Sequence, residues 1–463
     1  MEQSLDTRTV TLTKTFCNHL ATTTYESLTP AAVRECKRGI LDWLGCALAG
    51  SHHPELDITL ETLKLNGGRP VATVIGRGLK LGLLEAPIAN GQMGHLLDYD
   101  DTHMGGVVLH ASSPILAALF ALSEHLDEVR GPSSPVCTPV SGREFMLAYA
   151  TGFEAGVRVG RTAPGHHDGG WHLTGTLGTI AAGAACAKLL GLTGQQMTYA
   201  LAIAATQAAG MQQNRGTMCK SLHAGKAASN GLLAALLASK GFDGTQEIVE
   251  GNKGFGRIYS KTSESERLIE GLGGPWVIET NGHKPYACGV LLHPLIDAMV
   301  EMKQRHPVDP AQIEAIALRV HPLVLSITGV SEPSTGLQSK FSWKHSAAVA
   351  YVDGNAGIPQ YTDEKAVDPV IAALRGKVSA IGDASLGKDE AFAVMRAGGQ
   401  TFEIHIPHAS GTAANPMTDE AMRKKFVANA AGLAPAAAEA IVGLMERFDG
   451  SEAGRLMATC APR

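Results

Sequence analysis

The stretch GTIAAGAACAKLL, residues 178–190, carries the clearest information about the fold. It consists mostly of Ala and Gly, with Ile, Leu and Cys as its other apolar residues. Alanine has the highest intrinsic helix propensity, and the distance between packed helices falls when their contact residues are small. Runs rich in Ala and Leu and separated by Gly continue from about residue 86 to 240. The pattern predicts a large domain of tightly packed helices.

Cap residues mark the starts of two helices, one before the stretch 178–190 and one after it. Thr29 precedes Pro30, and apolar residues at helical spacing follow as far as Gly50. Thr193 with Gln196 forms a capping box before another Ala-rich run. We therefore expect residues 1–275 to form one all-helical domain.

The character of the sequence changes after residues 271–274. Apolar and polar residues alternate at Ile313–Val320 and again at 401–406, which is typical of strands. Helical periodicity returns beyond residue 416. We therefore predict a mainly α fold, in which residues 416–463 complete the all-helical domain and residues 276–415 form a smaller inserted α+β lid domain.

Composition excludes several classes of protein. The chain has 463 residues, 39 Lys and Arg against 44 Asp and Glu, and a formal net charge of −5, so we expect no nucleic-acid partner. No window is apolar enough for a membrane span. The eight cysteines are scattered without a Cys-x-x-Cys pair, which indicates reduced thiols and a cytoplasmic protein.

P-loop, Rossmann, His-Glu-x-x-His and Gly-x-Ser-x-Gly motifs are absent from the sequence, so single side chains must supply the chemistry.

The segment HLLDYDDTH, residues 95–103, is the first candidate site. It combines Asp98 and two further aspartates with two histidines, and His110 follows shortly after. Such a cluster can form an acid–base centre or a metal site. The alternative is an N-cap run, Asp100–Thr102, before a helix near 112–124.

The segment GWHLTGTLG, residues 170–178, is the second candidate. His172 stands directly before a helix, whose first turn offers unpaired N–H groups to an anion. The alternative is a capped turn with a structural imidazole.

Two further segments contain cations. In MCKSLHAGKAASNG, residues 218–231, Lys220, His223 and Lys226 follow one another at intervals of three. A partly desolvated Lys near other cations can act as a base, although the segment could also be a basic surface turn. In HKPYACGVLLHP, residues 283–294, Lys284 stands at the start of the lid, and Cys288 is a weaker candidate for a nucleophile. Together the four segments predict a cleft that binds a small molecule with several carboxylates and needs no cofactor.

These motifs, together with GLQSKFS (336–342) in the lid, resemble the MmgE/PrpD family along nearly the whole chain. That family includes 2-methylcitrate dehydratase, cis-aconitate decarboxylase and iminodisuccinate epimerase. The resemblance implies a homodimer without metal or cofactor, with a large helical domain and a smaller lid. The residues that we assign to catalysis are Lys220, His172, Asp98 and His110. Those that we assign to substrate binding are Thr102, Lys284, His223 and His103.

The resemblance leaves the reaction open between three outcomes of proton transfer at a carbon alpha to a carboxylate. The family's decarboxylases have a lid tyrosine after the first strand, whereas this chain has none in residues 321–325. We therefore predict an epimerase of an iminodisuccinate-like dicarboxylate, with dehydration of a 2-methylcitrate-like substrate as the alternative and decarboxylation as a further one. Lys220 or His172 is the expected base. A non-catalytic binding protein, or a metal enzyme using His95, Asp98 and His103, are the remaining alternatives.

Overall fold

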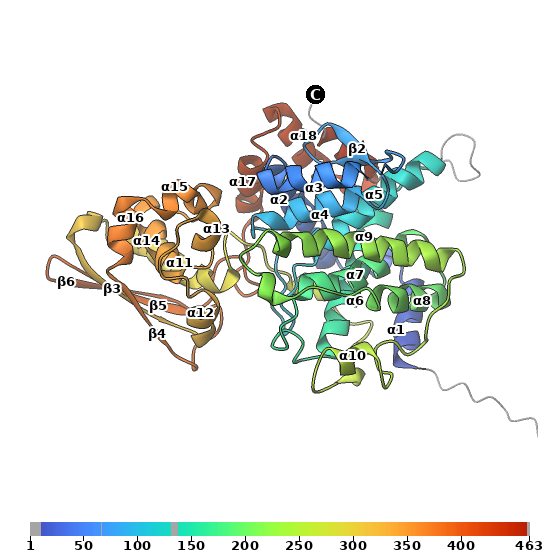
Figure 1. Cartoon of the computed structure of the whole chain (residues 1–463), viewed down its shortest axis with the longest axis horizontal. Helices are drawn as coiled ribbons and strands as arrows, with labels where there is room; N and C mark the ends of the chain where they lie inside the picture. The colour runs from blue at the N-terminus through green and yellow to red at the C-terminus, as the bar shows by residue number, and fades with distance from the viewer. Residues whose placement is uncertain (1–10, 66, 131–137, 461–463) are drawn as a thin grey trace, which may run out of the picture.

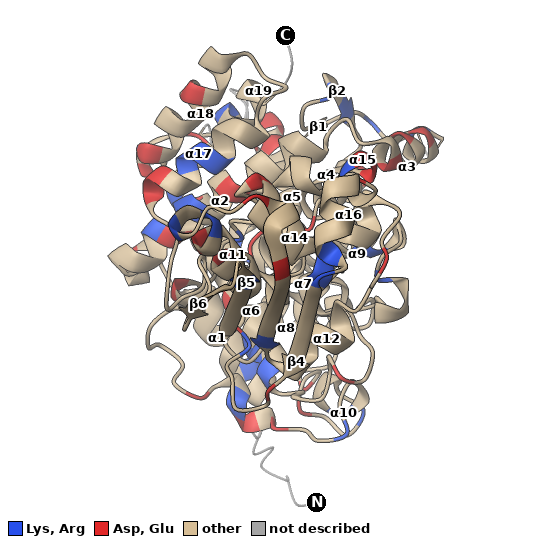
Figure 2. Cartoon of the chain, turned by 90° about the vertical axis from the view of Figure 1, so that its left-hand side faces the viewer, with Lys and Arg blue, Asp and Glu red and all other residues tan. Residues whose placement is uncertain are grey.

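The computed structural model describes residues 11–65, 67–130 and 138–460. Figure 1 shows a larger helical body, which contains both the early and the last helices of the chain, beside a smaller body that carries a sheet. The mainly α fold predicted from the sequence is confirmed. In the view of Figure 2, positively and negatively charged residues both occur along the elements, in keeping with the balanced composition.

The helical body is built around α7 (Leu173–Leu189), in which every residue from 173 to 187 is buried. Its small residues allow close approach, because a Cβ added to Gly231 of the neighbouring helix would lie 2.6 Å from the backbone nitrogen of Gly183. The other helices of this body are α1 (Leu12–Thr22), α2 (Pro30–Gly50), α3 (Pro54–Lys64), α4 (Ala86–Leu96), α5 (Ser112–Val129), α6 (Gly142–Arg161), α8 (Gly194–Ala205), α9 (Cys219–Ser239), α10 (Phe255–Ile258), α17 (Asp419–Asn429), α18 (Pro435–Glu446) and α19 (Gly454–Thr459).

The smaller body contains a four-stranded sheet in the order β4-β3-β5-β6. Its strands are β3 (Ile313–Val320), β4 (Val378–Gly382), β5 (Ala391–Ala397) and β6 (Gln400–Ile406). β3 and β4 are parallel and the other pairs are antiparallel. The longer helices α11 (His293–Arg305) and α14 (Trp343–Asp353) pack on the sheet, and the short helix α12 (Pro322–Ile327) packs against β4. The other short helices are α13 (Gly336–Ser339), α15 (Asp363–Ala366) and α16 (Pro369–Arg375).

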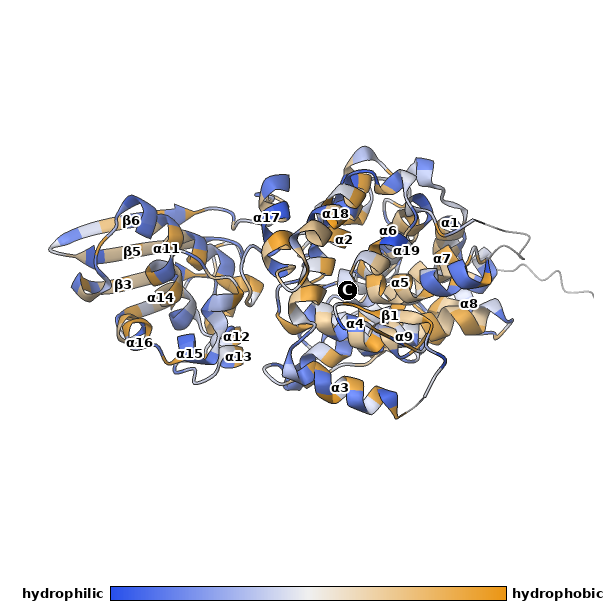
Figure 3. Ribbon diagram, turned by 90° about the horizontal axis from the view of Figure 1, so that it is seen from above, coloured by the Kyte–Doolittle hydropathy of each residue, from blue (hydrophilic) through white to orange (hydrophobic). Residues whose placement is uncertain are grey.

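Two hydrophobic cores correspond to the two bodies. One contains residues between 16 and 278 together with residues between 426 and 460, and the other contains mainly residues between 286 and 406. α17 packs against α2 and lies next to the junction of the bodies in Figures 1 and 3. On the basis of these cores, we propose that residues 416–463 complete the helical domain, as the sequence predicted.

Three features differ from the sequence-based expectation. The helical body is not purely helical, because β1 (Ala72–Val74) and β2 (Leu79–Leu81) form a short antiparallel hairpin. α11 and β4 were also not expected.

Seven of the cysteines lie in the described residues as free thiols, of which all but the half-buried Cys219 are buried, and Cys137 lies outside the described residues. None of the helices in the described ranges combines the length and apolarity that a membrane crossing requires.

Candidate active site

Asp98 lies in the turn after α4 and has an unusual backbone conformation. Its φ is 52°, and it is the one non-glycine residue with positive φ in the described part of the chain. This left-handed conformation costs roughly 1–3 kcal/mol for a residue with a Cβ, and such strain concentrates at functional sites. The surrounding structure must therefore hold the turn in place.

Three buried lysines hold this turn by its backbone. Lys340 Nζ donates to the carbonyl of residue 97 (2.8 Å), Lys284 Nζ to that of Asp98 (3.0 Å), and Lys425 Nζ to that of Tyr99 (2.7 Å). Lys340 lies in the GLQSKFS motif of the lid, whereas Lys425 lies on α17 of the helical body. The turn that carries Asp98 is thus fixed from both bodies at once.

The Asp98 carboxylate lies between two ammonium groups. Its Oδ1 is 2.6 Å from Lys284 Nζ and 3.2 Å from Lys220 Nζ, which stands in the first turn of α9. Burial acts to raise the pKa of Asp98, but Lys220 and Lys284 outweigh it and hold that pKa well below its usual value. Burial, assisted by Lys284, lowers the pKa of Lys220, and Asp98 opposes this shift. The three groups form one coupled charge cluster.

Neutral imidazoles stand beside this cluster. His172 is the residue before α7, as predicted, and its Nδ1 lies 2.9 Å from Nδ1 of His223. His110 Nδ1 lies 3.0 Å from Thr102 Oγ1. Burial, with nearby His and Lys groups, lowers the pKa of His172 far below its usual value, that of His110 to about 3 and that of His223 to about 4. These rings are therefore uncharged near neutral pH.

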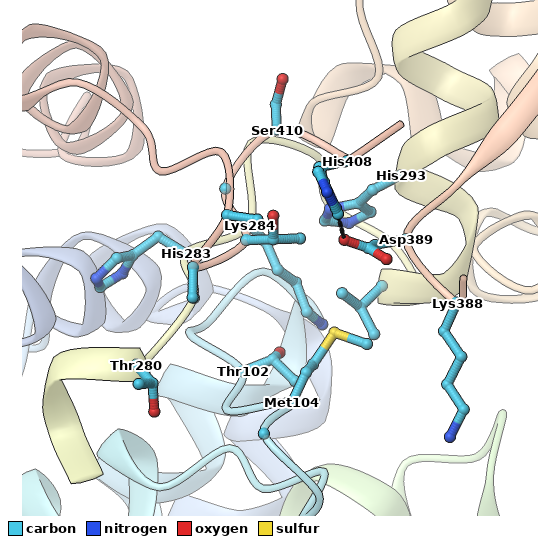
Figure 4. A pocket seen from close by; sticks show the side chains of 17 residues that line it. Thr102, Met104, Thr280, His283, Lys284, His293, Lys388, Asp389, His408 and Ser410 are labelled. Carbon is cyan, nitrogen blue, oxygen red and sulfur yellow. Dashed lines mark hydrogen bonds and ion pairs between the residues drawn. The ribbon is translucent and has the colours of Figure 1, made fainter. Parts of the chain in front are cut away.

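A cavity of about 200 Å³ collects most of the predicted site residues. Its lining includes Asp98, His110, His172, Lys220 and Lys284, together with Arg215, Lys388 and apolar residues of the lid. An adjoining cavity of about 500 Å³ shares Met104, Lys284, Val290 and Lys388 with it. Figure 4 shows this second cavity, with Thr102 and Met104 on one side and the hydrogen-bonded pair Asp389–His408 on another. Predicted residues from four separate segments thus lie around one connected space.

Two predicted substrate-binding residues lie outside the lining of both cavities. His103 is buried, its Nδ1 lies 2.8 Å from the carbonyl of Val107, and its Nε2 lies 3.3 Å from Thr280 Oγ1. His223 reaches the cavity only through its contact with His172. Their assignment to substrate binding stays a prediction.

The other interpretations of these segments have separate outcomes. α5 begins at Ser112 without a side-chain cap, so the run Asp100–Thr102 is not its N-cap. Lys226 is exposed on α9, so only part of that segment is a basic surface. Burial raises the pKa of Cys288 to about 12, which leaves a thiol rather than a nucleophilic thiolate.

A metal site would share only His95 with the predicted set of ligands. His95, Asp100 and His110 have potential ligand atoms within 4.8 Å of one another, whereas Asp98 and His103 are not part of this group. Asp100 already accepts a hydrogen bond from Ser113 and contacts His95 Nδ1 at 2.9 Å. His95 Nε2 is a buried nitrogen of this group that has no hydrogen-bond partner in the described residues. The contacts of Asp100 with Ser113 and His95 can fix the orientation of the His95 ring without a metal ion.

Four cations in and around the site were missed in the sequence. Lys340 lies in the GLQSKFS motif and Lys425 on α17, but their roles depend on bonds to residues far away in the chain. Arg215 and Lys388 stand in loops without periodicity or a recognisable motif. Only the three-dimensional structure brings these residues to the site.

Comparison with known proteins agrees with the resemblance of the motifs. Two family models match the chain, the MmgE/PrpD N-terminal domain over residues 14–268 and the MmgE/PrpD C-terminal domain over residues 286–448. A cis-aconitate decarboxylase of Aspergillus terreus is 33% identical over 306 residues, which are 64% of this chain and 61% of that protein. The match therefore spans less than two thirds of the Aspergillus protein.

Two other relatives are matched over more of their length. A cis-aconitate decarboxylase of Mus musculus is 27% identical over 95% of this chain and 91% of its own length. A 2-methylcitrate dehydratase of Cupriavidus necator is 24% identical over 79% of this chain and 77% of its own length.

Proposed function

Because the chain belongs to the MmgE/PrpD family, we propose that it is an enzyme that transfers a proton at the carbon alpha to a carboxylate of a small di- or tricarboxylate. The observation that carries this proposal is the Asp98–Lys220–Lys284 cluster beside neutral His172 at one cavity. Ammonium groups stabilise the negative charge that develops on a carboxylate when its alpha carbon loses a proton. A neutral imidazole or amine can hold that proton.

Among the outcomes of such proton transfer, a lyase reaction has the best support. The relatives described above are named as decarboxylases and as a dehydratase, which both break a bond to carbon and release CO₂ or water. The predicted preference for an epimerase has no such support. We therefore place the lyase outcomes first and keep epimerisation as the third outcome.

Decarboxylation and dehydration are supported by different observations. Decarboxylation is favoured by the names of the relatives with 33% and 27% identity. The lid argues against decarboxylation, because the segment after β3 presents Leu323 and Ile327 to the cavity instead of the tyrosine of the decarboxylases. This difference leaves dehydration as the other lyase outcome.

The roles of the side chains follow from their charge states. Lys220 and Lys284 bind a substrate carboxylate, and Asp98 keeps both ammonium groups in place while it offsets part of their charge. His172 accepts or returns the proton at carbon, and Lys220, whose pKa is lowered, is the second candidate for this role. Reprotonation from the opposite face would require two of these groups on opposite sides of the substrate.

The experiment is incubation with cis-aconitate, 2-methylcitrate or iminodisuccinate in D₂O, followed by proton NMR. The expected result is either loss of CO₂ from cis-aconitate with one solvent deuterium incorporated at carbon in the product, or loss of water from 2-methylcitrate together with its alpha proton. Deuterium entering iminodisuccinate without loss of any group would establish the epimerase instead. Absence of exchange and of turnover with every substrate would overturn the proposal, as would full activity of a Lys220→Met variant.

The homodimer that the resemblance implies stays a prediction, which light scattering can test.

A further inference from the structure

We propose that Arg215 binds a second carboxylate of the substrate, distinct from the one held by Lys220 and Lys284, and so selects for the number of carboxylates. The inference rests on the proposed function, because it assumes a polycarboxylate substrate. Arg215 follows the short 3-10 helix η2 (Gln212–Asn214) and precedes α9. It is half-buried and lines the same cavity as Asp98, Lys220 and His172.

The guanidinium of Arg215 has no counter-ion among the residues that the structure describes. Within the described residues, no carboxylate oxygen lies within 4.0 Å of Arg215, whereas Lys220 and Lys284 share Asp98. Burial lowers the pKa of Arg215, and the charge of Asp98 opposes this shift. A partly desolvated cation that faces a cavity without an anionic partner gains most from an anionic ligand.

A network of hydrogen bonds orients Arg215 before any ligand arrives. Its Nη2 donates to Oε1 of Gln212 at 2.7 Å. The amide nitrogen of Gln212 donates in turn to the carbonyl of His167 at 2.7 Å and to that of Trp171 at 2.9 Å. Because both hydrogens of this amide are engaged, the Gln212 oxygen must face Arg215. The remaining guanidinium N–H groups have the fork geometry that suits a carboxylate.

The charges around the cavity leave room for more than one carboxylate. Its cationic side chains are Arg215, Lys220, Lys284 and Lys388, and its acidic ones are Asp98 and Asp168. Asp168 is exposed and lies only 3.7 Å from His167 Nδ1, so it does not neutralise Arg215. Lys388 is exposed at the edge of the cavity, where solvent screens it more strongly. Arg215 is therefore the best-placed residue for the second carboxylate.

The test measures binding of two unreactive probes by calorimetry. Tricarballylate carries three carboxylates, and methylsuccinate has a methyl group in place of one of its carboxymethyl arms. We expect the wild-type protein to bind tricarballylate at least about 30-fold more tightly. Arg215→Gln should reduce this ratio to about 3-fold or less by weakening tricarballylate alone, and Arg215→Lys should give an intermediate ratio, because it keeps the charge but loses the fork.

Lys226→Gln is the matched control, because it removes one positive charge from an exposed position on α9. It should leave the ratio unchanged. A ratio that Arg215→Gln does not alter, or equal weakening of both probes, would overturn the role of Arg215 while the proposed function stands. If the wild-type protein turns over none of the polycarboxylates and binds neither probe, the proposed function itself fails, and this inference fails with it.

Discussion

Asp98 illustrates how a single residue can be kept against its own backbone preference. Glycine would occupy the left-handed turn after α4 without steric cost, but it would leave Lys220 and Lys284 without a shared anion. The carboxylate is therefore what the site requires of this position. Three lysine-to-carbonyl bonds stabilise the strained turn from outside.

The substitution Asp98→Asn tests the charge of this residue separately from its shape. Asparagine has nearly the same size and tolerates the left-handed conformation, so the fold should be retained. The two ammonium groups then face each other without an anion, which lowers the pKa of Lys220 further and weakens their fixed geometry. We expect kcat to fall by about 100-fold or more, measured as turnover of the substrate identified by NMR.

Asp101→Asn is the corresponding control. Burial and the neighbouring Asp100 raise the pKa of Asp101 to about 7, so near neutral pH this carboxyl is protonated about half of the time. It accepts hydrogen bonds from Ser112 and Asn281 and does not line either cavity. Equal loss of activity in both variants would argue that Asp98 acts through packing and not through its charge.

At the scale of elements, His283 connects the segment that enters the lid to α2. Its Nε2 lies 2.5 Å from Glu35 Oε1, and its Nδ1 lies 3.2 Å from Asp42 Oδ2. Burial acts to lower the pKa of His283, but the two carboxylates raise it to about 10. The imidazole is therefore charged near neutral pH and joins two elements that are distant in the sequence.

The substitution His283→Gln should destabilise the protein in a pH-dependent way. The pKa of His283 in the folded state lies above the ordinary value of about 6.5. The ion pairs of His283 therefore stabilise the fold fully below about pH 6.5, and this stabilisation is lost as the pH rises through about 10. At pH 6 we expect the variant to lose about 3–5 kcal/mol of unfolding free energy. Denaturant titrations of both proteins between pH 6 and 10.5 measure the difference, which should shrink over that range. A constant difference would show that His283 stabilises the junction by packing alone.

Local signals predicted the elements whose ends are set by nearby residues. The side chain of Thr29 caps α2, and Thr193 and Gln196 form the expected capping box of α8. β4 was missed because it is a short edge strand, of which only Val378 is buried, so it shows no alternation. Among the site residues, Asp98, His172 and Lys220 stand in distinctive motifs, whereas Arg215 is recognisable only by its position in space. Residues that are close in the sequence therefore predict the motifs, whereas the residues that meet these motifs in space are determined by long-range packing.

At the scale of the whole molecule, the chain returns to the helical body after the sheet. The C-terminal family model extends through residue 448, yet Phe426 and other residues of α17 and α18 belong to the core of the helical body. Lys425 places its ammonium group 2.6 Å from Asp42 Oδ1 on α2. Through Lys425, α17 therefore connects α2 to the turn that carries Asp98.

The substitution Phe426→Ala tests whether residues 416–463 complete the helical domain. Phe426 is 1% exposed, and a Cβ added to Gly45 on α2 would lie 3.1 Å from its ring. Truncation leaves a cavity at this contact and should cost about 3–5 kcal/mol. Hydrogen exchange should accelerate in α2 and α17, while the strands β3 and β5 keep their protection, because the lid has its own core. Met395→Ala, at a buried position of β5, should produce the opposite pattern. If Phe426→Ala instead exposes the strands first, the C-terminal helices belong energetically to the lid, and the proposed domain division is wrong.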